Sequence, residues 1–201
     1  MKYFLAIIIG YLIGCFSTGH MVSRLKQIDI RHTGTGNPGA SNITFILGWK
    51  MGVLVAFVDI SKGIIATLGA ILFTGDKVVG IYAGCACILG HMYPFYLKFH
   101  GGKGFATMIG VLIGFDFPFA VLATCFIFLI TWVTDYIVLS TLTITILFLL
   151  RVLEYPGGIY ALPILAPVIL IIFFKHRSNL YRIFVGRQGE KGFSLLFKKK
   201  H

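Results

Sequence analysis

Long apolar segments alternate with short polar ones along most of the chain. Several of the apolar segments approach the roughly 20 residues that an α-helix needs to cross about 30 Å of hydrocarbon. We expect membrane-spanning helices near residues 3–23, 48–73, 78–97, 104–116, 118–134, 136–150 and 159–174. The pattern predicts an all-α membrane protein, a seven-transmembrane-helix bundle that forms one domain over residues 1–201.

The fourth, fifth and sixth apolar segments have the least distinct boundaries. Phe117 and Pro118 separate the fourth segment from the fifth, and Asp135 alone separates the fifth from the sixth. The fourth segment is also short for a crossing. Six crossings with a re-entrant piece is therefore the alternative architecture.

The composition agrees with a bilayer environment. Hydrophobic residues make up 57% of the chain and charged residues 12%, with a mean hydropathy of +0.89, which excludes an ordinary soluble domain. The first apolar run lacks a strongly basic leading region and a small-residue cleavage site, so we expect it to be a retained helix. The cysteines all lie in apolar runs and are expected to be small buried apolar residues, with no metal site: Cys15, Cys85, Cys87 and Cys125.

The basic residues indicate an orientation. The net charge is +11, but the lysines and arginines are scattered at the ends of apolar segments, which does not favour a nucleic-acid partner. With seven crossings and an external N-terminus, the outer side keeps only Lys2, Lys77 and Arg151 of the basic residues outside the helices. The positive-inside rule then predicts a cytoplasmic C-terminus and three polar segments that face the cytoplasm.

The first polar segment, RHTGTGNPGASN, runs from Arg31 to Asn42. Its three glycines and its proline are incompatible with a regular helix. Glycine allows successive backbone N–H groups to converge on an anion, and neighbouring side chains can donate hydrogen bonds to a phosphate. The candidate donors are Thr35, Asn37, Ser41 and Asn42. The alternative is a tight turn between two helices.

The second polar segment, GHMYPFYLKFHGGKGFAT, runs from Gly90 to Thr107. It places His91 at the end of one crossing and Gly101, Gly102, Lys103 and Gly104 immediately before the next. A helix N-terminus with exposed N–H groups and a nearby ammonium favours a bound phosphate. The alternatives are an interfacial lysine at 103 and a helix-terminal histidine at 91 that bonds to the backbone.

The third polar segment, KHRSNLYRIFVGR, follows the last crossing. At helical spacing His176 and Asn179 share a face with Arg182 or Arg187. The alternative is a basic anchor for anionic lipid. Within the membrane, Asp59 and Lys62 stand three residues apart, and the cost of burying charge predicts either an ion pair or a polar cavity beside them. The ion pair is the favoured interpretation.

With these residues in order, the chain resembles the bacterial acyl-phosphate:glycerol-3-phosphate acyltransferases, integral membrane enzymes of phospholipid synthesis. The resemblance rests on GTGNPGASN, DISKG, GHMYPFYLKFHGGKGFAT and KHRSN, and it covers essentially the whole chain. It implies a seven-helix bundle in the bacterial cytoplasmic membrane, with an active site facing the cytoplasm. The implied substrates are acyl phosphate and glycerol 3-phosphate, and the implied product is lysophosphatidate.

The resemblance also assigns residues. It implies first-motif contacts at Thr35, Gly36, Asn37 and Asn42, a phosphate loop at Gly101, Gly102, Lys103 and Gly104, and third-motif contacts at His176 and Asn179. The chain departs from the family pattern where Thr35 replaces a usual serine, Phe45 a frequent arginine, Val138 a usual serine and Gln188 an expected glutamate. Because phenylalanine cannot replace the bidentate phosphate contacts of arginine, a diverged paralogue with an altered acceptor is one alternative.

The expected chemistry is direct transfer. An acyl phosphate is already activated, so the enzyme mainly positions a glycerol hydroxyl and stabilises developing charge. We expect Lys103 and the surrounding glycine N–H groups to hold phosphate, and His176 to orient the site or assist proton transfer. The residues expected to orient the acceptor are Asn37, Asn42 and Asn179. No cofactor, metal or obligate protein partner is expected. We expect the protein to be surrounded by membrane lipid. A transporter for a phosphorylated metabolite is the alternative from another class.

Overall fold

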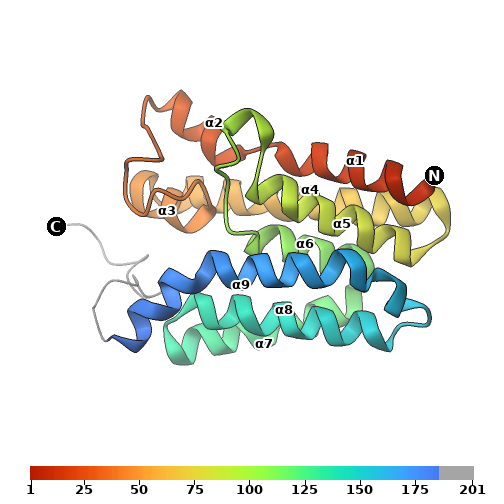
Figure 1. The fold of residues 1–201 in the computed structure, drawn as a ribbon. Coiled ribbons are helices and arrows are strands. Elements are labelled where there is room, and N and C mark those ends of the chain that lie inside the picture. Colours follow the sequence, from red (N-terminus) through yellow and green to blue (C-terminus); the bar gives the residue numbers. More distant parts are fainter. Residues whose placement is uncertain (186–201) are drawn as a thin grey trace.

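The computed structural model describes residues 1–185, which form helices and connecting loops without a strand. This part of the chain confirms the all-α prediction. Figure 1 shows the long helices packed side by side in one bundle. The elements are α1 (Lys2–Cys15), α2 (Thr18–Leu25), α3 (Ala40–Leu47), α4 (Trp49–Thr74), α5 (Lys77–Met92), η1 (Phe95–Leu97), α6 (Phe105–Phe115), α7 (Phe117–Thr134), α8 (Ile137–Glu154), η2 (Gly158–Ala161) and α9 (Leu162–Phe184).

Six segments among the described residues are long and apolar enough to cross a membrane. They comprise α1 with α2, α4, α5 with η1, α7, α8, and η2 with α9. The remaining apolar helix, α6, has only 11 residues. Each of the seven predicted apolar segments is therefore helical, and the fourth is the short one, as its sequence indicated.

The first membrane segment is interrupted between α1 and α2, a feature that hydropathy did not predict. The backbone leaves the helical conformation at Phe16 and Ser17. The Tyr96 hydroxyl donates a hydrogen bond of 2.8 Å to the Cys15 carbonyl, and the Lys62 ammonium donates one of 2.9 Å to the Phe16 carbonyl. Such partners are what a broken helix needs inside a bilayer, where water cannot satisfy the freed carbonyls.

Close backbone approach joins α1 to α5. A Cβ atom added at Gly14 would lie 2.0 Å from the Cys87 carbonyl oxygen, and one added at Gly90 would lie 2.2 Å from the Tyr11 carbonyl oxygen. Small residues at such contacts let membrane helices pack tightly. The consequence is that the end of α5, which carries His91, is fixed against the helix break.

The short helices and the polar loops gather at one end of the bundle (Figure 1). The N-terminus and the last turn of α9 lie at opposite ends. α2, α3 and the segment that precedes α6 gather at the end where α9 finishes. All three polar segments predicted from the sequence therefore lie at one end of the bundle, as far as the structure describes them.

Two expectations need correction. The segment from Arg31 to Asn42 was expected to be irregular throughout, but α3 begins at Ala40 and includes Ser41 and Asn42. Cys125 was expected to be buried, but it is exposed on α7, whereas the other three cysteines are buried. On a helix that faces lipid, a cysteine is apolar enough to remain at the surface.

Candidate active site

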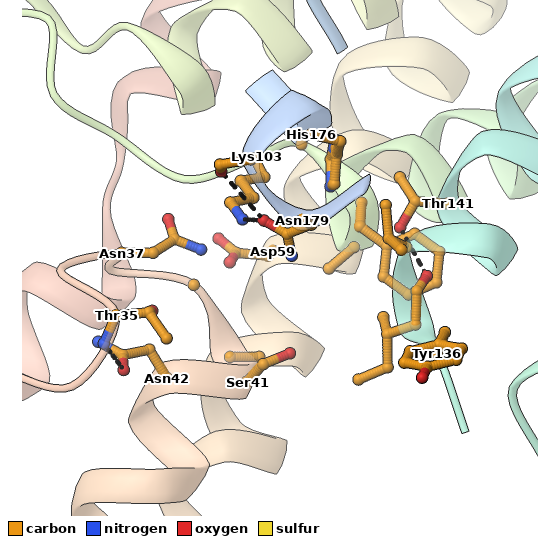
Figure 2. Close-up of a pocket in the computed structure, with 18 of the residues that line it drawn as sticks. Thr35, Asn37, Ser41, Asn42, Asp59, Lys103, Tyr136, Thr141, His176 and Asn179 are labelled. Carbon is orange, nitrogen blue, oxygen red and sulfur yellow. Dashed lines mark hydrogen bonds between the residues drawn. The ribbon is translucent and has the colours of Figure 1, made fainter. Parts of the chain in front are cut away.

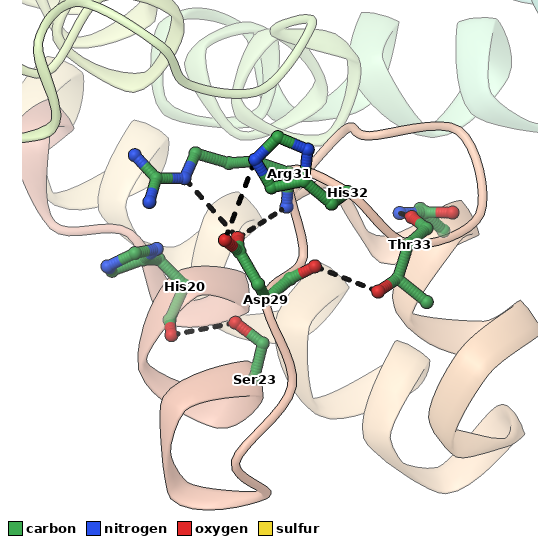
Figure 3. A network of polar contacts seen from close by, with 7 residues as sticks. His20, Ser23, Asp29, Arg31, His32 and Thr33 are labelled. Carbon is green, nitrogen blue, oxygen red and sulfur yellow. Dashed lines mark hydrogen bonds and ion pairs between the residues drawn. The ribbon is translucent and has the colours of Figure 1, made fainter.

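The loop before α3 is built on local hydrogen bonds around Asp29 (Figure 3). The Asp29 carboxylate accepts from the Arg31 amide at 3.1 Å and from Arg31 Nε at 3.3 Å, and the Thr33 hydroxyl donates to the Asp29 carbonyl at 2.8 Å. The backbone hydrogen bond from Arg31 is the main reason that the pKa of Asp29 lies below its ordinary value. Arg31 is thus used to shape the loop, and it does not line the cavity described below.

Asn42 ties this loop to α3. Its side-chain oxygen accepts a hydrogen bond of 2.9 Å from the Thr35 amide, and its side-chain nitrogen donates one of 3.1 Å to the Thr33 carbonyl. Gly36 has a φ of +71°, which favours glycine, and turns the chain towards Asn37. Asn42 therefore holds Thr35 and the following turn in place.

The second polar segment is fixed against the end of α5. The Gly101 amide donates to the Met92 carbonyl and the Gly102 amide to the His91 carbonyl, each at 3.1 Å. These two amides already donate to backbone carbonyls, so they do not form the phosphate-binding loop that the sequence predicted. α6 begins at Phe105 after Gly104, whose φ is +91°, and no side chain caps this N-terminus. The amides of the first turn of α6 are therefore the ones that a helix leaves without an intrahelical acceptor.

The third polar segment lies on α9. The Lys103 ammonium donates a hydrogen bond to the side-chain oxygen of Asn179 (Figure 2). His176 is 4% exposed, and its Nδ1 lies 2.9 Å from the Ile172 carbonyl oxygen. Because a carbonyl oxygen only accepts, Nδ1 carries a proton, and in the neutral imidazole Nε2 is then an acceptor.

These segments enclose a cavity of about 240 Å³. Figure 2 shows Asn37, Lys103 and Asn179 converging on it from three different parts of the chain. Nine of the predicted site residues line the cavity: Thr35, Asn37, Ser41, Asn42, His91, Lys103, Gly104, His176 and Asn179. Gly36, Gly101 and Gly102 do not line it, and their places in the turns described above explain why.

The cavity has further walls that the sequence did not indicate as part of a site. Tyr136 and Thr141 reach it from the start of α8, and Ser178 from α9. Asp59 also lines it and forms the predicted ion pair with Lys62 at 2.7 Å. Tyr136 and Thr141 lie in the predicted apolar segment 136–150, which carries no motif, so only the folded arrangement brings them to the other residues.

An apolar groove of about 360 Å³ adjoins the polar cavity. Its walls come from α3, α4, α6, α7 and the first residue of α8, and five residues line both spaces: Ala40, Ser41, Phe105, Ala106 and Ile137. The polar cavity and a space suited to a hydrocarbon chain thus lie side by side at the N-terminus of α6 and share a wall.

The glycerol-3-phosphate acyltransferase family model matches residues 4–186, almost the whole chain. This chain belongs to that family. A glycerol-3-phosphate acyltransferase of Aquifex aeolicus (strain VF5) is 39% identical over 193 residues, which cover 94% of this chain and 98% of the relative. Glycerol-3-phosphate acyltransferase 1 of Oceanobacillus iheyensis is 35% identical, with 99% of each chain covered.

Solved structures of family members share this fold. PlsY (YgiH), an integral membrane glycerol 3-phosphate acyltransferase, matches in its glycerol 3-phosphate form with a TM-score of 0.86 and 36% identity, covering 98% of this chain and 100% of PlsY. Its lysophosphatidic acid form matches with a TM-score of 0.82 at the same identity, covering 98% of this chain and 97% of PlsY. The family membership and the membrane helices favour an acyltransferase over the transporter that the sequence left as an alternative.

Proposed function

We propose that this protein transfers an acyl group from an acyl phosphate to glycerol 3-phosphate in the cavity between α3, α6 and α9, and so forms lysophosphatidate. The observation that carries the proposal is that the polar cavity and the apolar groove lie side by side and share a wall. An acyl phosphate needs both, because its phosphate is charged and its chain is apolar. Ser41 and Phe105 line both spaces, so the acyl carbonyl belongs near the border between them.

The polar contacts favour phosphate at the start of α6. The Lys103 ammonium, the amides of the first turn of α6 and the positive end of its dipole all favour an anion. Arg182, Asn37 and Asn179 line the same cavity and supply further donors. In this arrangement Lys103 binds phosphate by charge, and the asparagines orient the acceptor.

The reaction then needs one nucleophilic attack. A glycerol hydroxyl oxygen bonds to the acyl carbonyl carbon, the bond between that carbon and the phosphate oxygen breaks, and inorganic phosphate leaves. The hydroxyl proton passes to His176 Nε2, which the Nδ1 contact with Ile172 leaves as an acceptor, or to the departing phosphate. Because the donor is an activated mixed anhydride, no acyl-enzyme intermediate is required.

The departures from the family pattern bear on the acceptor. Phe45 and Val138 line the cavity, whereas Gln188 lies outside the described residues. We propose that glycerol 3-phosphate remains the acceptor, because Lys103 and Arg182 still supply cations to the cavity. A diverged paralogue would instead prefer another acceptor.

Purified protein, tested with acyl phosphate and labelled glycerol 3-phosphate, is expected to release lysophosphatidate and inorganic phosphate in equal amounts. Acyl-CoA as the sole donor and glycerol as the sole acceptor serve as the comparison reactions. Equal activity with acyl-CoA would contradict the proposed donor, and a preference for glycerol would favour the diverged paralogue. Absence of lysophosphatidate under all conditions would contradict the proposed function.

The orientation is part of the proposal: seven crossings, an external N-terminus, and an active site and C-terminus that face the cytoplasm of a bacterial cell. Single thiols introduced into a cysteine-free variant test it. His100→Cys and Ser178→Cys, both at exposed positions at the site end, should react only from the cytoplasmic side. Glu154→Cys, at the exposed end of α8, should react only from outside. The reverse pattern would invert the orientation.

A further inference from the structure

A buried polar network lies beside the cavity, and the proposed reaction leaves its central residue, Lys62, without a role. Asp59, Lys62 and His91 are 2%, 4% and 8% exposed. The Lys62 ammonium lies 2.7 Å from Asp59 Oδ1, 2.8 Å from His91 Nδ1 and 2.9 Å from the Phe16 carbonyl oxygen. The contacts with His91 and with Phe16 are hydrogen bonds, and the contact with Asp59 is a buried ion pair.

This geometry determines which nitrogen of His91 holds the proton. A lysine ammonium only donates, so His91 Nδ1 must accept its hydrogen bond. An imidazole that accepts at Nδ1 and is neutral carries its proton on Nε2. Asp59 Oδ1, the other group that could bond to Nδ1, is more distant at 3.5 Å. The contacts therefore favour the neutral Nε2–H form of His91.

The Nε2 edge of His91 lies against the second polar segment. A Cβ atom added at Gly102 would come within 2.1 Å of His91 Nε2, and the Gly102 amide donates to the His91 carbonyl. Lys103, which follows directly, reaches into the cavity (Figure 2). The side chain and the main chain of His91 thus both contact Gly102, the residue that precedes Lys103.

Lys62 also controls the charge beside the cavity. Asp59 and His91 line the cavity, and an unpaired Asp59 carboxylate there would repel a bound phosphate. The ion pair with Lys62 cancels that charge, and the neutral form of His91 adds none. A buried charge of this kind is costly unless it is paired. Removing Lys62 alone is therefore expected to impair phosphate binding more than removing the charges of both Lys62 and Asp59.

We propose that Lys62 is a positioning residue for the phosphate-binding part of the site. It holds His91 as the neutral Nε2–H form against Gly102, and it neutralises Asp59 beside the cavity. The inference rests on the proposed function, because it assumes that the cavity binds a phosphate-bearing substrate. It extends that function by giving the buried ion pair a part in substrate binding in addition to its part in the fold.

The protonation of His91 is tested directly by ¹⁵N NMR of histidine-labelled protein in detergent. His91→Gln identifies the His91 signals among the six histidines. Wild-type protein is expected to show His91 as the neutral Nε2–H form, and Lys62→Met is expected to remove that form, because Nδ1 then turns to Asp59. A wild-type His91 that is protonated on Nδ1 would overturn the proposal. This measurement needs no turnover, so its result is independent of whether lysophosphatidate is formed.

Kinetics separate a positioning role from a purely structural one. Lys62→Met is expected to raise the KM for phosphate-bearing substrates roughly ten- to a hundredfold with a much smaller change in kcat. The double variant Asp59→Asn/Lys62→Met, which leaves no unpaired carboxylate, should recover part of that loss. Lys50→Met, on the exposed start of the same helix, is the matched control and should retain the wild-type KM.

The outcomes are distinguishable. A folded Lys62→Met variant with unchanged KM would overturn the proposal, as would a double variant that binds no better than the single one. If Lys62→Met does not fold, the wild-type spectrum still decides which nitrogen is protonated and so supports or overturns the proposal. If the wild-type protein forms no lysophosphatidate, the proposed function fails, while the spectrum still tests the Lys62–His91 relationship.

Discussion

The Lys103 ammonium donates a hydrogen bond to the side-chain oxygen of Asn179, a residue 76 positions later in the chain. This contact joins the start of α6 to α9 at the polar cavity. It brings together the second and third polar segments, which hydropathy alone could place only on the same side of the membrane. It also leaves the Asn179 side chain with its NH₂ group as donor for a substrate oxygen.

His176 is expected to matter through Nε2. His176→Asn keeps an amide donor near the position of Nδ1, and so can keep the bond to the Ile172 carbonyl, but it removes the Nε2 acceptor. We expect kcat to fall by about two orders of magnitude, as for loss of a general base. The measurement is steady-state lysophosphatidate formation, with His32→Asn at an exposed position as the control. Near wild-type activity of His176→Asn would assign proton transfer to the departing phosphate.

The glycines before α6 are expected to be intolerant of a side chain. A Cβ atom at Gly101 would lie 2.1 Å from the His91 carbonyl oxygen, which belongs to backbone that cannot easily move. Gly101→Ala should therefore destabilise the fold by about 1–3 kcal/mol and displace Lys103, which lowers activity further. Thermal unfolding in one detergent and kcat/KM measure the two effects.

Gly69→Ala is the matched control for this substitution. Gly69 lies within α4, and a Cβ atom there meets no atom within 4 Å. Alanine also favours a helix over glycine by up to about 1 kcal/mol. We expect this variant to be as stable as the wild type or more stable, and fully active. Equal stability and equal kcat/KM of Gly101→Ala and Gly69→Ala would argue against tight packing of the glycines before α6.

Asp116 is expected to contribute stability that depends on pH. Burial raises the pKa of Asp116, but hydrogen bonds from Arg151 and the Phe119 amide outweigh it and hold the pKa below its ordinary value of 3.8. A carboxylate with a lowered pKa contributes stability above its unfolded pKa and loses it as the pH falls through the folded value. The residue lies between α6 and α7, at the end of α6 away from the cavity.

Asp116→Asn should therefore lower the stability at neutral pH by about 1 kcal/mol. The difference from wild type should stay constant from about pH 8 to 5 and shrink below about pH 4, as Asp116 takes up its proton. The KM for glycerol 3-phosphate should not change. Thermal unfolding across this pH range measures the effect, and a constant difference at all pH values would contradict it.

Local patterns in the sequence predicted much of the fold. The positions of the apolar helices follow from hydropathy, and the Asp59–Lys62 pair follows from helical spacing and the cost of charge in a membrane. The break at Phe16 was not predictable, because its partners Tyr96 and Lys62 are distant in the sequence. α3 was missed because its first residues belong to a segment dominated by glycine and proline.

The candidate site, too, was predictable where local sequence patterns mark it and not where it depends on contacts between distant residues. His91, Lys103 and Asn179 were found because each belongs to a polar motif at the end of an apolar segment. Tyr136 and Thr141 belong to no motif and reach the cavity only because α8 packs beside it. The occupied amides of Gly101 and Gly102 were likewise not predictable, since the sequence does not reveal which carbonyl groups the loop meets.

The most direct test of the central claim is the activity of Lys103→Ala in lysophosphatidate formation from acyl phosphate and glycerol 3-phosphate. We expect kcat/KM to fall by the equivalent of about 2–4 kcal/mol, because the variant lacks a preorganised cation at the phosphate site. Lys26→Ala, at an exposed position beyond α2, should keep wild-type activity. Thermal unfolding in the same detergent must show that both variants are folded. A folded Lys103→Ala variant with full activity would contradict the assignment of this cavity as the phosphate site.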